Sequence, residues 1–82
     1  MTEVYIGVMG EYLIASYRNQ NEVIPQTLKI QCHRVNRTTL AALAEKLIKN
    51  LSGRIEPRKF PDSSPLNPGQ EAMLLHFYDS HK

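Results

Sequence analysis

Eighty-two residues are enough for one small domain, residues 1–82, but too few to enclose a deep active-site cavity beside a full core. The single cysteine, Cys32, excludes an intrachain disulfide and a cysteine-rich zinc cage, and it favours a cytoplasmic location. The net charge is only +2, and the sequence has neither a signal-peptide pattern nor the roughly 18 apolar residues that cross a bilayer, so we expect no membrane partner.

The first expected element is a β-hairpin over residues 3–18. Apolar residues alternate with their neighbours from Val4 to Val8, which is the period-two pattern of a strand with one buried face. Gly10 and Glu11 fit a two-residue hairpin turn in which the glycine takes a positive φ. The turn therefore fixes which residues of the two strands face each other.

This register makes two predictions about the hairpin. Met9 faces Tyr12 beside the turn, and Glu3 faces Arg18 at the open end, as an opposite-charge cross-strand pair. One face of the hairpin is then apolar along its whole length. Its residues are Val4, Ile6, Val8, Leu13, Ala15 and Tyr17.

A third strand is expected after a polar, turn-prone segment that ends at Pro25. Residues 27–35 alternate again, with Leu28 and Ile30 on the apolar side and Lys29 and Gln31 opposite them. Because one face stays polar, we expect this strand to be half exposed and antiparallel to the second strand.

The hydrophobic period then changes from two residues to that of a helix. Apolar residues recur at helical spacing on one stripe, which we expect to pack on the apolar face of the hairpin. Thr38 or Thr39 is the expected N-cap, and Glu45 and Lys49 are spaced as an ion pair on the exposed side. The stripe consists of Leu40, Leu43, Ala44, Leu47, Ile48 and Leu51.

Residues 54–67 are expected to form an extended connection without regular structure, since four of the five prolines lie between Pro57 and Pro68. Asn67 and Gln70 then form the ends of a helix capping box, which predicts a C-terminal helix. The alternative is a type II turn leading into a C-terminal strand.

The predicted fold class is α+β. A three-stranded antiparallel sheet, made of the hairpin plus the third strand, packs on one amphipathic helix. The Pro-rich connection and the C-terminal helix, or the alternative C-terminal strand, complete the chain.

No residue pattern predicts catalysis, a cofactor or a metal. Cys32 and His33 are neighbours in a strand, so their side chains point to opposite faces and cannot act as nucleophile and base. His76 and His81 have the spacing of half a zinc finger, but such a site also needs two cysteines and the chain has only one. We therefore expect a protein that is not an enzyme.

The outer face of the predicted sheet is the candidate site. It is richer in apolar and aromatic residues than a plain solvent face, so something is expected to cover it. The C-terminal segment with Leu74, Phe77 and Tyr78 is one candidate, and a second copy or another macromolecule is the other. The predicted partner-binding residues are Tyr5, Tyr12, Ile14, Arg18, Lys29, Gln31 and His33.

The middle of the chain is basic, with eight basic and two acidic residues between Lys29 and Lys59. The sequence favours a small protein-binding module, such as an inhibitor or adaptor of a larger enzyme, including one that handles nucleic acid. Direct DNA or RNA binding is the alternative, and self-association stays open. The predicted basic patch consists of Arg34, Arg37, Arg54, Arg58 and Lys59.

Overall fold

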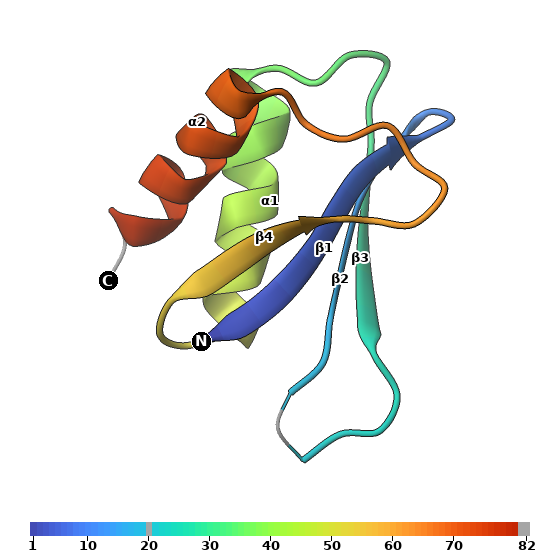
Figure 1. The fold of residues 1–82 in the computed structure, drawn as a ribbon. Coiled ribbons are helices and arrows are strands. Elements are labelled where there is room, and N and C mark those ends of the chain that lie inside the picture. The colour runs from blue at the N-terminus through green and yellow to red at the C-terminus, as the bar shows by residue number, and fades with distance from the viewer. Residues whose placement is uncertain (20, 81–82) are drawn as a thin grey trace.

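A computed structural model describes residues 1–19 and 21–80 (Figure 1). The fold is α+β, with a four-stranded mixed sheet in the order β3-β2-β1-β4 and both helices on one face of it. The elements are β1 (Thr2–Met9), β2 (Tyr12–Tyr17), β3 (Gln26–Gln31), α1 (Arg37–Asn50), β4 (Ile55–Lys59) and α2 (Pro68–Asp79).

The β1–β2 hairpin has the predicted register. Met9 pairs with Tyr12, and Gly10 between the strands has φ 61°, the left-handed region that a glycine enters without a Cβ clash. The pairing ends at Val4 and Tyr17, so the predicted Glu3–Arg18 pair is wrong. Glu3 instead lies beside β4, where it forms an ion pair with Arg58 at 3.2 Å.

The third strand, β3, is antiparallel to β2, as the alternation predicts, but it is shorter than residues 27–35. It ends at Gln31, and the next amide, that of Cys32, donates to the carbonyl of Glu11 at 2.8 Å. The chain then turns toward α1. His33 therefore lies in the connection and not on the strand.

The prediction of three antiparallel strands is wrong in one element. Residues 55–59, inside the expected Pro-rich connection, form β4, which pairs with β1 in the parallel direction at the edge of the sheet. In the sequence, the prolines of this segment, including Pro57, indicated a connection without regular structure. Proline is nevertheless compatible with an edge strand, where one side of the backbone needs no partner. Ile55 is buried and anchors the strand to the core.

Both helices begin with a capping box. In α1 the N-cap is Asn36 rather than a threonine, with Thr39 as its reciprocal partner, and the Glu45–Lys49 pair forms at 3.6 Å. In α2 the predicted caps, Asn67 and Gln70, make the reciprocal bonds at 2.8 and 3.1 Å. The helix prediction for the C-terminal segment is confirmed, and the strand alternative is wrong.

A single apolar cluster lies between the sheet and the two helices. Leu74 and Tyr78 of α2 belong to it, so α2 packs on the helical side and does not cover the outer face of the sheet. The buried members of the cluster are Val4, Ile6, Leu13, Ala15, Tyr17, Leu40, Leu43, Ala44, Leu47, Ile55, Leu74 and Tyr78.

Two buried tyrosines make the fold sensitive to alkaline pH. Burial raises the pKa of Tyr17, and the Glu22 charge raises it further; burial and Asp79 raise the pKa of Tyr78. Because folding favours the neutral phenol, this stabilisation is complete below about pH 10 and is lost as pH rises through the folded-state pKa values.

We expect urea midpoints to fall above about pH 10 and the fall to be smaller in Tyr17→Phe, since phenylalanine cannot ionise. The comparison with the parent chain at each pH separates this effect from the titration of lysines. An equal alkaline fall in the two proteins would contradict the assignment to Tyr17.

Candidate functional site

The candidate site is the outer face of the sheet, the face that points away from α1 and α2. Alternate residues of each strand reach it, because successive side chains of a strand point to opposite faces. In β1 and β2 these residues include Tyr5, Gly7, Met9, Tyr12 and Ile14.

A segment of the chain crosses the middle of this face. A Cβ placed on Gly7 would collide with the hydroxyl of Ser63 and would lie 2.6 Å from the Ser63 Cβ and 3.2 Å from the Phe60 Cβ. Only a glycine allows the segment to approach so closely. Residues 60–63 therefore lie directly on the outer face above Gly7, and we call them the crossing turn.

Pro61 and Asp62 form the centre of the crossing turn, and Asp62 has a positive φ of 62°. The hydroxyl of Ser63 donates to the carbonyl of Phe60 at 2.6 Å and closes the turn. The next residue, Ser64, forms a bridge with Val8 through two backbone hydrogen bonds of 2.8 and 3.0 Å. Both ends of the crossing turn are thus tied to β1.

The crossing turn divides the predicted binding residues into accessible and covered ones. Ile14 points outward, opposite Gly7, but only 5% of it is exposed, so it cannot be a large contact for a partner. Tyr5, Met9 and Tyr12 remain 38%, 39% and 42% exposed. These three side chains are the accessible apolar part of the outer face.

The charges of this face are largely paired within the chain. The guanidinium of Arg58 contacts carboxylates on two sides, Glu56 at 2.6 Å and Glu3 at 3.2 Å. The ammonium of Lys29 lies over the ring of Tyr12, 5.8 Å from its centroid. The face thus carries both signs of charge around its aromatic residues.

A groove of about 920 Å³ runs from this face around the end of the sheet. Residues from β1, β2, the crossing turn and the loop after α1 form its walls. They include Tyr5, Ser16, Arg18, Leu51, Phe60 and Pro61. The groove therefore combines aromatic side chains with the cationic side chain of Arg18.

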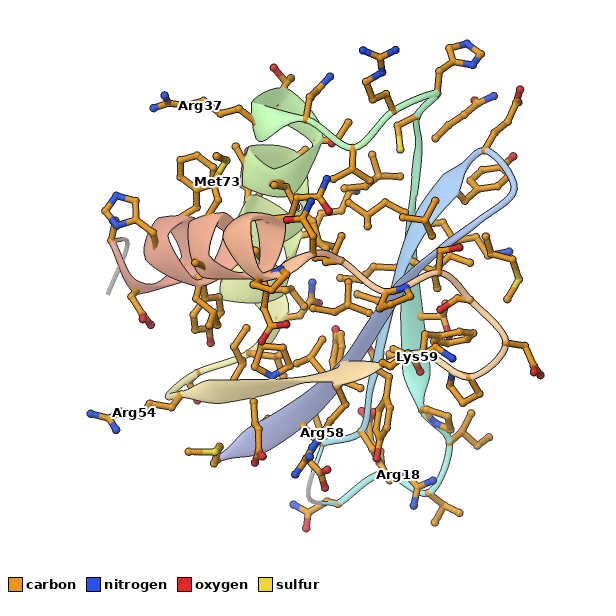
Figure 2. All side chains as sticks on the ribbon, turned by 45° about the horizontal axis from the view of Figure 1, so that its top comes forward. Arg18, Arg37, Arg54, Arg58, Lys59 and Met73 are labelled. Atoms are coloured by element: carbon orange, nitrogen blue, oxygen red, sulfur yellow. The ribbon has the colours of Figure 1, made fainter. Side chains whose placement is uncertain are left out.

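The predicted basic patch is distributed over different parts of the molecule. Arg37 begins α1 and its guanidinium lies 5.6 Å from the ring centroid of Phe77, whereas Arg54 follows the other end of that helix. A helix of 14 residues separates the two by about 20 Å. Figure 2 places Arg37 and Arg54 apart from Arg58 and Lys59 on β4.

Two further predicted residues lie near one another beside the β1–β2 turn. His33 contacts Glu11, with 3.7 Å between Nδ1 and the carboxylate, and both side chains are exposed. Gln31, the last residue of β3, pairs with Tyr12. Arg34 follows His33 in the exposed connection to α1.

The loop between β2 and β3 carries a feature that the sequence reasoning missed. Val23 and Ile24 are 86% and 78% exposed, and the loop extends beyond the end of the sheet (Figure 1). The signal in the sequence that could have predicted this feature is the presence of two adjacent β-branched residues inside a polar turn segment. They are a second exposed apolar site.

Potential metal-ligating side chains do not gather in the described part of the chain. Within residues 1–19 and 21–80, no three His, Cys, Asp or Glu side chains lie close enough together to hold a metal ion. Cys32 is half-buried beside the core, and His81 lies outside the described residues.

Comparisons with family models, with curated proteins and with solved structures find no match to this chain. In the described part of the chain, the helices are too short and too polar to cross a bilayer.

Proposed function

We propose that this chain is a non-catalytic binding module that docks another protein on the outer face of its sheet. The observation that carries the proposal is the exposure of Tyr5 on one side of the crossing turn and of Met9 and Tyr12 on the other, on a face that neither helix covers. Tyrosine is a frequent anchor of protein interfaces, because its rigid ring buries a large area at a low cost in side-chain entropy. The activity that we propose for so small a module is to inhibit a larger enzyme or to act as its adaptor.

The charges favour a protein partner over a nucleic acid. A polyanion-binding face needs several cations that are free to meet phosphates. Arg58 already lies between the carboxylates of Glu3 and Glu56. A surface with both signs of charge around aromatic residues suits the mixed surface of another protein.

Direct binding of DNA or RNA is the second proposal, and it rests on two exposed cations. Arg18 lines the groove, and Lys59 lies on the edge strand β4, where it pairs with Ile6 and so points to the helical side of the sheet. Binding of this kind weakens steeply as salt rises, because each phosphate contact releases counterions. A strong salt dependence of binding to a DNA or RNA duplex would therefore favour this second proposal over the first.

We expect Tyr12→Ala to weaken capture of the partner by at least roughly fivefold, since truncation of an interface anchor costs more than about 1 kcal/mol. The matched control is Met73→Ala on α2, because Met73 is 39% exposed, close to the 42% of Tyr12, but lies on the helical side (Figure 2). The measurement is quantitative pull-down with mass spectrometry, followed by titration of the captured protein.

Equal losses in Tyr12→Ala and Met73→Ala would contradict the outer face as the docking surface. So would unchanged capture by a Tyr5→Ala/Tyr12→Ala double variant that retains the urea midpoint of the parent chain.

A further inference from the structure

The two edges of the sheet differ in their capacity to pair with another strand. The strand order makes β3 one edge and β4 the other. An edge strand presents backbone N–H and C=O groups that another chain can use. An edge strand can pair with another chain only where its residues direct their backbone N–H and C=O groups away from the sheet.

The backbone groups of Thr27, Lys29 and Gln31 face the open side of β3. The amide of Cys32 donates to Glu11 of the hairpin, and in an antiparallel ladder the bonded residues alternate. The even-numbered residues of β3 therefore bond to β2, and the odd-numbered ones point away from it. No segment in the described part of the chain pairs with that side of β3.

The edge of β4 lacks this capacity. The carbonyl of Arg54 accepts from Thr2 at 3.1 Å, and the amide of Phe60 donates to Ile6 at 3.0 Å, so the even-numbered residues face β1. The backbone groups of the odd-numbered residues point to the open side of the strand, and the central one of these residues is Pro57, which has no N–H. Proline thus blocks one edge, and β3 contains none.

The side chains of β3 indicate what could pair there. Lysine on an edge strand commonly discourages pairing, but the Lys29 ammonium lies over the Tyr12 ring on the outer face and leaves the backbone edge open. A second copy paired symmetrically about Lys29 would set two lysines opposite each other, which is unfavourable. A partner strand with a carboxylate at that position would be favoured instead.

Resting on the proposed function, we propose that the partner protein binds by adding an extended, acidic strand along the open edge of β3. The added strand forms backbone hydrogen bonds with Thr27, Lys29 and Gln31. Its carboxylates lie on the outer face beside Lys29, and its apolar residues continue the layer of Leu28 and Ile30 at the rim of the core. The strand thereby extends the docking face that contains Tyr12.

The test uses the full chain and a short synthetic peptide, blocked at both ends, in which valine alternates with glutamate. In the free chain the amides of Leu28 and Ile30 exchange slowly with solvent, and those of Thr27, Lys29 and Gln31 exchange fast. With peptide at about ten times its Kd, exchange of the three fast amides slows roughly tenfold. NMR hydrogen exchange measures each amide. The control peptide replaces every glutamate with lysine and binds more weakly.

Two variants remove single edge donors without breaking the β2–β3 ladder. Thr27→Pro and Gln31→Pro weaken peptide binding by roughly two- to tenfold relative to Thr27→Ala and Gln31→Ala, the loss expected for one hydrogen bond. Pro57 already occupies the equivalent kind of position on the other edge. Urea unfolding of all four variants checks that the fold persists.

The outcomes separate this proposal from the proposed function. Unchanged exchange of the three amides at millimolar peptide overturns strand addition, as does equal binding of the lysine peptide or protection of the same amides by self-association of the chain alone. If Tyr12→Ala abolishes capture of a protein while the β3 amides of that complex stay unprotected, the outer face binds without strand addition. If the peptide protects them while Tyr12→Ala leaves capture unchanged, only the docking face is wrong.

Discussion

Gly7→Ala is expected to destabilise the protein by about 1–3 kcal/mol, although alanine is normally the better strand residue. The new methyl group would occupy the space now taken by Ser63, whose Cβ lies 2.6 Å from the position of the added carbon. Ser63 cannot move freely, because its hydroxyl closes the crossing turn on Phe60 and its neighbour Ser64 is bonded to Val8. The crossing turn must therefore lift from β1.

A double-mutant cycle tests this cause. Ser63→Gly removes the colliding side chain, so we expect Gly7→Ala to cost less in that background, with a coupling of about 1 kcal/mol or more. Urea unfolding monitored by tyrosine fluorescence gives all four free energies. Gly7→Ala within about 0.5 kcal/mol of the parent chain, or additive effects of the two changes, would contradict the contact.

Tyr78→Ala is expected to cost about 3–5 kcal/mol, the usual range for removing a buried aromatic side chain. Tyr78 is buried in the core from the last turn of α2, and its hydroxyl donates to the carbonyl of Gly53 at 2.8 Å. That bond ties the C-terminal helix to the turn between α1 and β4. A domain of this size has a total stability of only roughly 5–10 kcal/mol, so the loss is a large fraction of it.

Tyr78→Phe separates the two parts of this effect. It keeps the ring and removes the hydroxyl, so about 1 kcal/mol should be lost. Met73→Ala, on the exposed side of the same helix, should change stability by less than about 0.5 kcal/mol. Similar midpoints for Tyr78→Ala and Met73→Ala in thermal or urea unfolding would show that α2 is not anchored through this ring.

Local sequence patterns predicted the parts of the fold that depend on interactions between neighbouring residues. The Gly10 turn and the alternation from Val4 to Val8 were sufficient for the hairpin register, since a two-residue turn fixes every later pair. Asn67 and Gln70 indicated the start of α2, since a capping box is made within four residues, and the structure decided against the strand alternative.

The candidate site depended on contacts between distant residues, and here the sequence was less informative. The pattern placed Tyr5, Tyr12 and Ile14 on one face, which the structure confirms. It did not predict that Ile14 is buried or that residues 60–63 lie on its cross-strand neighbour Gly7, because those residues lie some fifty positions away along the chain. Nor did it predict that the basic residues between Arg34 and Lys59 are spread along α1 and β4.

The sequence by itself determined the hairpin register, the presence of a third strand, the helix α1 and which side chains of β1 and β2 point away from the core, whereas it favoured α2 without excluding a strand. Only the tertiary structure decided that residues 55–59 form a strand, because its partner β1 lies some fifty residues earlier and its proline is tolerated only at an edge. The physical reason is the range of the interactions. Turns, caps and periodicity act within a few residues, whereas strand pairing and the coverage of a sheet face join segments that meet only when the chain folds.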